Sequence, residues 1–598
     1  MTKDSSIISS FLKIRAILPK EHKIKLLFSF FLLFTNSILE LAGLAALLPF
    51  FSIMLKENFL EESTQLKLVY DFFSFNSVQW FIVFLCCGIL VIIILKNIAS
   101  TIIFRFQSNF AFNLYAYLSR RLYESTYSKG LLYFKSVNSN VVINSIANAP
   151  SLFAQFFLLP FLTILNELVV VIMIIVGIIL YSPKLVFFLL FTIVPISVLV
   201  YLYVRRKLQG VGEKKAEQSI QLATNIRQSI EGYVDVKILN KEAFFLSKYS
   251  KTLESSTKLS VNSSVLMTIP TKVIETGMVM AMLTLLFFGL FVMENREQFV
   301  TLIGLFAIAG YRILPSINRM MAAILSMKEN QYTIDIISDF KAFSPSAAGP
   351  TEKKVQVMTF KEVISIENIS FAYPGQNSVV DNFTLQVAKG ETVGVIGRSG
   401  SGKSTLMNIL LRFFKEEKGA IKVDGLELNE ANEDAWRSLI GYVQQDVYLL
   451  DGSILENVAF GKNKHEVDMD KLKDTIEMAS LSGFVESLPL GINTPLGERG
   501  AKLSGGQRQR IGIARALYAN AQILLFDEAT SALDNETEAE ITESIRKLKE
   551  KDLTMIIIAH RYTTLQYCDR IVRMDKGMIT KNYTFEELKQ DNLQKFRK

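Results

Sequence analysis

Residues 397–405, Gly-Arg-Ser-Gly-Ser-Gly-Lys-Ser-Thr, form a glycine-rich segment whose spacing is typical of a loop that binds nucleotide phosphates. The glycines allow backbone N–H groups to surround an anionic triphosphate, and Lys403 is expected to reach the β- and γ-phosphates. The Ser404 hydroxyl is expected to hold Mg²⁺. The expected nucleotide contacts in this segment are Gly397, Ser399, Gly400, Gly402, Lys403, Ser404 and Thr405.

Two carboxylates, Asp527 and Glu528, follow a short apolar run at residues 523–526 that predicts a buried strand. Phosphoryl transfer needs a metal ion that neutralises the leaving oxygens and a group that orients the attacking nucleophile. We therefore expect Asp527 to hold Mg²⁺ through water and Glu528 to polarise the attacking water.

Two more polar side chains stand at the ends of predicted strands. His560 comes shortly after apolar residues 555–558, and Gln445 comes after the expected strand 440–443. A single histidine is usually structural, but at a strand end in a nucleotide-binding fold it is expected to contact the γ-phosphate. Gln445 is expected to sense the metal ion or the attacking water.

These groups need a sheet and a helix to bring them together. The apolar run 392–396 predicts a buried strand before the glycine-rich segment, and 406–414 predicts a helix whose N-terminus favours negative charge. Residues 363–371 alternate as a strand does, and Tyr373 beyond them could stack on adenine. The C-terminal part of the chain is therefore expected to be an α/β nucleotide-binding domain.

The remainder of the chain indicates a membrane domain. The chain has 598 residues, half of them hydrophobic, and a mean hydropathy of +0.29. Apolar residues concentrate before about residue 325. The net charge of +8 is explained by basic cytoplasmic flanks rather than by nucleic-acid binding. Three cysteines show no metal-binding spacing and are expected to be structural.

Six apolar stretches are long enough to span a bilayer. Basic residues gather in alternate connections, which predicts cytoplasmic termini. Two long cytoplasmic connections are helical in pattern, with turning points expected at 134–146 and 229–245, and are expected to contact the soluble domain. The expected spans cover about residues 24–55, 80–104, 151–181, 185–204, 265–293 and 299–324.

The connection between the first two spans, 56–79, is the long one on the outer side. Leu66, Val69, Tyr70 and Phe73 recur within it at helical spacing. This pattern predicts a short amphipathic helix at the outer membrane surface. The alternative is a structured loop that caps the spans.

Four basic residues lie inside the spans, away from their ends: Arg312 and Arg319, which share one helix face, and Lys96 and Lys272. A charge at bilayer depth costs roughly 2.5–3.5 kcal/mol on insertion scales, so retained charges usually face a cavity or a partner. We expect these four to form a basic lining for an anionic substrate. The alternative is that they reach the inner interface or pair with carboxylates. Those carboxylates are Glu40, Glu167 and Glu275.

With a further motif, Leu503-Ser-Gly-Gly-Gln507, residues 363–598 resemble the nucleotide-binding domain of ABC transporters. The resemblance implies ATP and Mg²⁺ as cofactors, Tyr373 as the adenine platform and Glu528 as the catalytic carboxylate. Gln444 stands where many relatives have proline. Further roles implied by the resemblance are ATP contacts by Ser504, Gly505, Gly506, Gln507 and Asp534, a catalytic switch at His560, a water or metal contact by Gln445, and a contact to the membrane domain by 494–500.

The whole chain resembles type IV exporter half-transporters. We expect a membrane domain at 1–338, a linker at 339–361 and a nucleotide-binding domain at 362–598. In that family ATP lies between the phosphate loop of one domain and the Leu-Ser-Gly-Gly-Gln motif of another. The resemblance therefore implies a domain-swapped homodimer with two sites, spanning the bacterial cytoplasmic (inner) membrane among its lipids.

The membrane half carries the substrate prediction. Residues 39–51, the outer segment and 311–319 resemble flippases of lipid-linked oligosaccharides, of the PglK type, from bacterial N-glycosylation. The resemblance implies ATP-driven flipping of a polyprenyl-diphosphate glycan, with Arg312 and Arg319 handling the substrate; Lys96 and Lys272 replace arginines and lose the bidentate fork. One alternative is export of peptides, drugs or lipids such as lipid A. Another is an ATP-gated channel or regulatory subunit, which the intact Glu528 and His560 disfavour.

Overall fold

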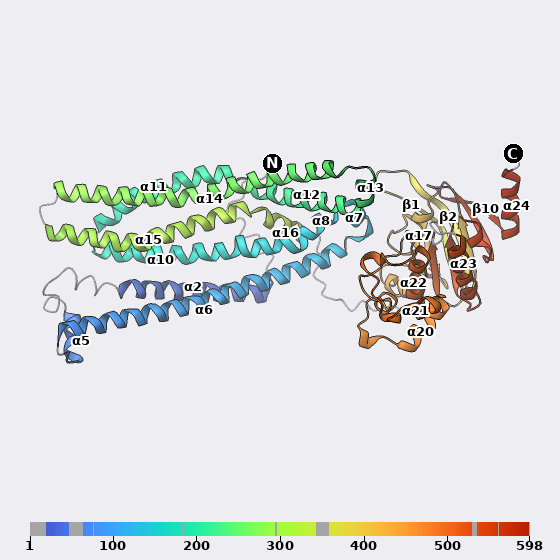
Figure 1. Ribbon diagram of the computed structural model, residues 1–598, viewed down its shortest axis with the longest axis horizontal. Helices are drawn as coiled ribbons and strands as arrows, with labels where there is room; N and C mark the ends of the chain where they lie inside the picture. Colours follow the sequence, from blue (N-terminus) through green and yellow to red (C-terminus); the bar gives the residue numbers. More distant parts are fainter. Residues whose placement is uncertain are drawn as a thin grey trace. The chain divides into compact units, whose positions relative to one another are not determined.

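The computed structural model describes residues 19–46, 64–75, 77–181, 183–292, 296–342, 358–528, 535–559 and 561–596. The chain divides into two compact units, Met1–Ala347 and Ala348–Lys598 (Figure 1). Long helices make up the first unit, and two sheets with surrounding helices make up the second. The predicted fold class, a helical membrane domain followed by an α/β domain, is confirmed.

Long helices occupy the described parts of all six predicted spans. Among the described residues, four helical stretches are long and apolar enough to cross a membrane: Lys20–Gly43, Val78–Tyr127, Ser139–Ile179 and Glu242–Phe287. The fourth and sixth predicted spans coincide with α11 and α15. The principal helices of this unit are α2 (Lys20–Ala45), α6 (Val78–Tyr127), α10 (Leu159–Tyr181), α11 (Pro183–Leu208), α14 (Glu242–Val292) and α15 (Arg296–Glu329).

Two of these helices are far longer than a bilayer requires. Helices α6 and α14 have 50 and 51 residues, about 75 Å at 1.5 Å per residue, against a hydrocarbon core of about 30 Å. Short helices follow or precede them at the predicted turning points, which are confirmed. These short elements are α7 (Gly130–Ser136), α8 (Ser139–Ile143) and α13 (Tyr233–Ile238). The longer helix α12 (Val211–Glu231) precedes α13, and α16 (Tyr332–Ala342) is the last described helix of the unit.

Wide helical turns precede α10. The π-helices η1 (Asn144–Asn148) and η2 (Ala154–Leu158) flank α9 (Ala149–Phe153). Pro160 lacks the N–H that would bond to the Phe156 carbonyl. The Ser326 hydroxyl of α15 donates to that carbonyl at 3.0 Å. A hydrogen bond close to the proline therefore joins η2 to α15.

The membrane helices pack in neighbouring pairs: α10 with α15, α11 with α14, and α2 with α6 (Figure 1). One buried cluster joins α10, α11, α14 and α15 through apolar side chains. At Gly310 of α15 a side chain would lie 2.3 Å from the methyl group of Met278, so glycine leaves room for the end of this α14 side chain. The cluster comprises Val170, Ile174, Ile178, Ile193, Met278, Ala281, Phe306 and Ile313.

The predicted outer helix is present as α5 (Thr64–Phe72), although Phe73 lies in the turn that follows it. Its Tyr70 ring packs edge-on against the buried Phe81 of α6, with centroids 5.3 Å apart. The predicted apolar face therefore covers the start of α6. Leu68 and Phe72 remain 65% and 81% exposed, which leaves an apolar surface available to lipid.

The second unit contains two sheets. An antiparallel sheet has the strand order β2-β1-β4-β5, and a six-stranded sheet has the order β10-β9-β3-β8-β7-β6. In β1 buried and less buried residues alternate as predicted. The bounds are β1 (Val363–Ala372), β2 (Ser378–Ala388), β3 (Thr392–Ile396), β4 (Lys418–Val423), β5 (Leu426–Glu427), β6 (Ile440–Val443), β7 (Ile523–Asp527), β8 (Thr554–Ile558), β9 (Arg570–Asp575) and β10 (Met578–Tyr583).

The strand order of the larger sheet positions the predicted site. Strands β9, β3, β8, β7 and β6 are parallel, so their carboxyl ends lie along one edge, where ligands bind in such sheets. The glycine-rich segment leaves β3, the two carboxylates leave β7, and Gln445 follows β6. The sheet thus explains why polar residues distant in sequence can act together.

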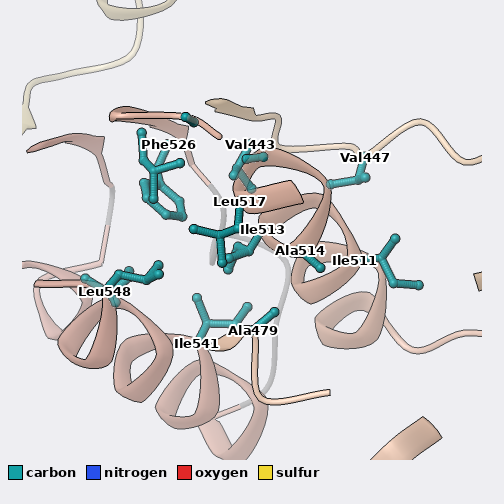
Figure 2. Close-up of a cluster of buried hydrophobic side chains, with 14 of the residues drawn as sticks. Val443, Val447, Ala479, Ile511, Ile513, Ala514, Leu517, Phe526, Ile541 and Leu548 are labelled. Carbon is teal, nitrogen blue, oxygen red and sulfur yellow. The ribbon is translucent and has the colours of Figure 1, made fainter. Parts of the chain in front are cut away.

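Helices complete this unit. The helix α22 (Gly505–Tyr518) lies between the sheet and α23 (Asn535–Lys549). Figure 2 shows Val443 and Phe526 on one side of its apolar residues, with Ile541 and Leu548 on another. The other helices include α17 (Lys403–Leu410), α18 (Glu433–Leu439), α19 (Ile454–Val458), α20 (Met469–Met478), α21 (Ser482–Ser487) and α24 (Phe585–Phe596).

Candidate functional site

The glycine-rich segment forms a tight loop that runs directly into α17. Gly402 precedes the helix with φ of 101°, a backbone conformation that strongly favours glycine. At Gly397 an added side chain would lie 2.3 Å from the Met574 carbonyl oxygen. The loop is therefore confined by its neighbours, and the first turn of α17 presents backbone N–H groups to it.

Lys403 lies within this loop. Its Nζ donates to the carbonyls of Gly397 at 2.9 Å and Arg398 at 3.1 Å, and the residue is 5% exposed. Burial lowers the pKa of Lys403, while the charges of Glu528 and Asp527 partly oppose that shift. The structure thus brings the loop lysine into electrostatic contact with both predicted carboxylates.

Tyr373 lies beside the same loop. Its hydroxyl is 3.2 Å from the Thr405 hydroxyl, and its ring packs edge-on against Phe414, with centroids 5.6 Å apart. Phe371 stacks on Phe414 and supports this arrangement. The tyrosine predicted to stack on adenine is therefore adjacent to the phosphate loop, and its adenine contact stays a prediction.

Asp527 ends β7 and receives a hydrogen bond from Tyr442 of β6, whose hydroxyl lies 3.1 Å from Oδ2. In this parallel pair Tyr442 stands opposite Leu525, so Asp527 is its diagonal neighbour on the same face. Burial, followed by the Asp527 charge, raises the pKa of Tyr442. The hydroxyl therefore remains protonated and can orient the carboxylate.

Glu528 adopts an unusual backbone conformation. Its φ of 51° is positive, a region that few residues other than glycine adopt and that often marks functional sites. Its backbone N–H donates to the Ile558 carbonyl of β8 at 2.9 Å. The positive φ coincides with the end of β7 at Asp527, and the catalytic role of Glu528 stays a prediction.

Gln445 is held through its backbone by α22. The Gln509 side-chain amide donates to the carbonyls of Gln444 at 3.1 Å and Gln445 at 2.6 Å. Arg515, two turns along α22, donates to the Tyr448 carbonyl at 2.9 Å. One helix therefore fixes both ends of the segment that carries Gln445.

Leu503–Gln507 forms the start of α22. The Ser504 hydroxyl accepts from the Gln507 N–H at 3.2 Å, and the Gln507 side chain accepts from the Ser504 N–H at 2.9 Å. This reciprocal capping fixes the helix N-terminus, where an anion is favoured. At Gly506 a side chain would lie 1.8 Å from Cγ2 of Thr537. Gly506 therefore allows α22 to pack closely against α23.

Mg²⁺ was expected at Ser404, Gln445 and Asp527. Ser404 lies exposed in the first turn of α17, and Asp527 lies half-buried at the end of β7. Their oxygens are the donors that Mg²⁺ prefers, so these residues fit the ion together with nucleotide phosphates. No cluster of three or more His, Cys, Asp or Glu among the described residues could hold a metal alone. Asp534 and His560 lie outside the described residues.

Three of the intramembrane charges meet in one cluster. Lys96 of α6 and Arg312 of α15 both contact Oε2 of Glu40 on α2, each at 2.9 Å. The exposed fractions of the side chains are 18% for Lys96, 17% for Arg312 and 14% for Glu40. Two cations share one carboxylate, so the cluster keeps a net positive charge. We call these residues the Glu40 cluster.

Arg319 and Lys272 are placed differently. Arg319 binds Glu167 of α10 through two hydrogen bonds, of 2.6 and 3.1 Å, and this carboxylate is 5% exposed. Lys272 lies 3.2 Å from Glu275 on the same helix, and its side chain is 71% exposed. Both cations thus have their own carboxylate. All four cations contact one of the three carboxylates, which is the paired arrangement weighed as the alternative. A basic lining for a substrate stays a prediction.

Several residues of these sites were not expected. Strand order and helix packing give Tyr442, Gln509 and Thr537 their roles, and short sequence motifs do not reveal either of these. The signal for Tyr442 was its position three residues before Gln445 in a predicted strand. The sequence indicated Glu40 as a possible partner for an intramembrane cation, but it did not indicate that two cations share it.

Comparison with known proteins adds to this geometry. Residues 26–312 match the ABC transporter transmembrane region, and residues 380–531 match the ABC transporter model. The chain is 30% identical to the "ATP-dependent lipid A-core flippase" of Bordetella avium, over 71% of this chain and 72% of that protein. A helical membrane unit followed by a phosphate-loop domain defines a membrane transporter. The chain belongs to the ABC transporter family.

Two further likenesses are informative. The protein of the same name from Francisella tularensis subsp. holarctica is 32% identical, over 64% of this chain. The match spans 63% of that relative's own length. A solved structure, that of a bacterial Atm1-family ABC exporter with ATP bound, superposes with a TM-score of 0.76 over 95% of this chain and 96% of that one, at 19% identity. This likeness supports the exporter-type fold.

Proposed function

We propose that this protein is an ATP-driven flippase that moves a phosphate-bearing lipid across the bacterial cytoplasmic membrane. The observation that carries the proposal is the Glu40 cluster, an excess of positive charge buried among membrane helices. Such a charge is costly at this depth unless it serves an ion pathway or an anionic substrate.

The driving force in this proposal is ATP hydrolysis. The Gly397–Thr405 loop binds the triphosphate, and Mg²⁺, when bound, neutralises charge on the phosphate oxygens. Tyr442 holds Asp527 in place for that ion, and Glu528 orients the attacking water. His560 and Asp534 are assigned their switch and nucleotide contacts by resemblance.

The proposed assembly is a homodimer with two ATP sites. Each chain has one phosphate loop and one Leu503–Gln507 motif, which begins a capped helix suited to a phosphate. In transporters that this chain resembles, the two motifs of a site come from different domains. A second copy would therefore supply the missing half.

Two cargo lipids fit the proposal. The relatives named as lipid A-core flippases favour lipid A, a phosphorylated glycolipid. The motifs at 39–51 and 311–319 favour a polyprenyl-diphosphate oligosaccharide, as in flippases of the PglK type. Both carry lipid-linked phosphate, which is the chemistry that Arg312 and Lys96 would recognise.

Proteoliposomes containing the full chain test this function. Labelled lipid A and labelled lipid-linked oligosaccharide are supplied separately, and transfer between leaflets is followed with and without ATP. We expect ATP-dependent transfer of at least one of them and none with Glu528→Gln. Equal transfer of both without ATP, or of neither with ATP, would contradict the proposal.

A further inference from the structure

The Glu40 cluster differs from the other intramembrane ion pairs in its charge balance. One carboxylate oxygen of Glu40 serves both Lys96 and Arg312, whereas Glu167 binds Arg319 alone with both oxygens among the described residues. A bidentate pair is geometrically complete. The Glu40 cluster is one negative charge short of neutrality.

Donors in this cluster are also incompletely used. Within the described part of the chain, the buried Nε of Arg312 has no hydrogen-bond partner. The same holds for the buried hydroxyl of Ser316, one turn along the same face of α15. Buried donors normally find partners, because an unpaired buried donor loses the hydrogen bonds that it makes with water in the unfolded chain. An acceptor with several oxygens would satisfy these donors.

The local packing makes room for this arrangement. At Gly43 of α2, one turn from Glu40, a side chain would lie 2.8 Å from Cδ of Lys96. Glycine therefore lets the lysine stem cross α2 and reach Glu40. The shared carboxylate joins three helices, α2, α6 and α15, at one point.

We propose that Glu40 is an internal substitute for the substrate anion. A lipid-borne phosphate replaces Glu40 on Arg312 and Lys96, and its extra oxygens also satisfy the donors that Glu40 leaves unpaired. Loss of these ion pairs uncouples α2 from α6 and α15, so substrate binding loosens a contact between helices. This inference rests on the proposed function and specifies how the same site selects an anion.

Binding by the full-length protein in phosphatidylcholine nanodiscs tests the substitution. The probes are polyprenyl phosphate, the matching uncharged polyprenol and inorganic phosphate. With its competitor removed, the Glu40→Gln variant should bind polyprenyl phosphate about tenfold more tightly, which is about 1.4 kcal/mol, and polyprenol as wild type does. Glu275→Gln, which removes an exposed carboxylate, is the matched control and should change neither.

A second variant guards against misfolding of Glu40→Gln. Lys96→Met leaves Arg312 and Glu40 as a neutral pair, so it should weaken binding of polyprenyl phosphate at least tenfold without exposing an unpaired charge. Unchanged binding by this variant, or weaker binding by a folded Glu40→Gln protein, would overturn the displacement. Displacement of the lipid by millimolar inorganic phosphate would overturn the requirement for a lipid-borne group.

The outcomes separate this inference from the proposed function. Wild-type binding of polyprenyl phosphate without any gain in Glu40→Gln counts against Glu40 as a competitor, and leaves flipping untouched. Failure of the wild type to bind polyprenyl phosphate, combined with no ATP-dependent transfer in proteoliposomes, would overturn both.

Discussion

The two units carry their charges in contrasting ways. In the nucleotide unit, Lys403, Asp527 and Glu528 come together because parallel strands end at one edge, and each follows from a short motif. In the membrane unit, the charges of Arg312 and Arg319 look equivalent in sequence but have different partners. The comparison teaches that an intramembrane cation is understood only with its counter-ion.

The largest expected effect tests the nucleotide unit. Glu528→Gln should lower ATPase turnover at least about 100-fold, because the amide cannot polarise the attacking water. Phosphate release by purified protein measures it. Glu543→Gln, in an exposed ion pair on α23, is the matched control. Turnover like that of wild type in Glu528→Gln would remove Glu528 from the mechanism.

Close helix packing gives the next effect. Gly506→Ala places a methyl group where Thr537 lies, and overpacking of this kind typically costs about 1–3 kcal/mol. The thermal midpoint should fall, and a second change, Thr537→Ser, should restore it. Gly483→Ala, where the added group meets open space, should leave the midpoint unchanged. A stable Gly506→Ala protein would disprove the packing role.

Stability can also distinguish the two arginines. Arg319→Ala leaves the buried Glu167 without its cation, at an expected cost of roughly 2 kcal/mol, below the range for fully buried pairs because the guanidinium is 43% exposed. Arg312→Ala leaves Glu40 paired with Lys96 and should cost less. Thermal unfolding in one detergent measures both variants. If Arg312→Ala instead lowers stability more than Arg319→Ala does, the Glu40 cluster is the one that stabilises the fold.

The smallest effect concerns Tyr442. Tyr442→Phe removes the hydrogen bond to Asp527, so ATPase turnover should fall about three- to tenfold and require more Mg²⁺ for half-maximal activity. Tyr583→Phe removes a similar bond to Asp591 in another part of the unit, and should leave the Mg²⁺ dependence unchanged. An unaltered Mg²⁺ requirement in Tyr442→Phe would exclude this positioning role.

The sequence predicted the fold class and the strands that carry the candidate nucleotide residues, because both depend on local patterns. Apolar runs predicted the strands β3, β7 and β8, and the helical period predicted α5 and the turns near α7 and α13. Gly402 indicated a backbone conformation with positive φ, which residues with side chains rarely adopt. The sequence was sufficient to predict a structural feature wherever residues that are neighbours in the chain form it.

Features that depend on packing between distant segments were less predictable. The bond from Tyr442 to Asp527 needs β6 to lie beside β7, and the place of Gly506 needs α23 beside α22. Helical spacing placed Arg312 and Arg319 on one face, but only the packing of α2 and α10 assigns Glu40 to one and Glu167 to the other. The spacing of the charges along the helices therefore could not predict which carboxylate each of the four cations contacts.

The most direct test measures the activity of each unit separately in one variant protein. Arg312→Ala is reconstituted in proteoliposomes, and its basal ATPase and its transfer of phosphorylated lipid are measured side by side. We predict ATPase activity close to wild type together with loss of transfer, since the nucleotide unit is untouched and the anion site is lost. Transfer at the wild-type rate would contradict the account.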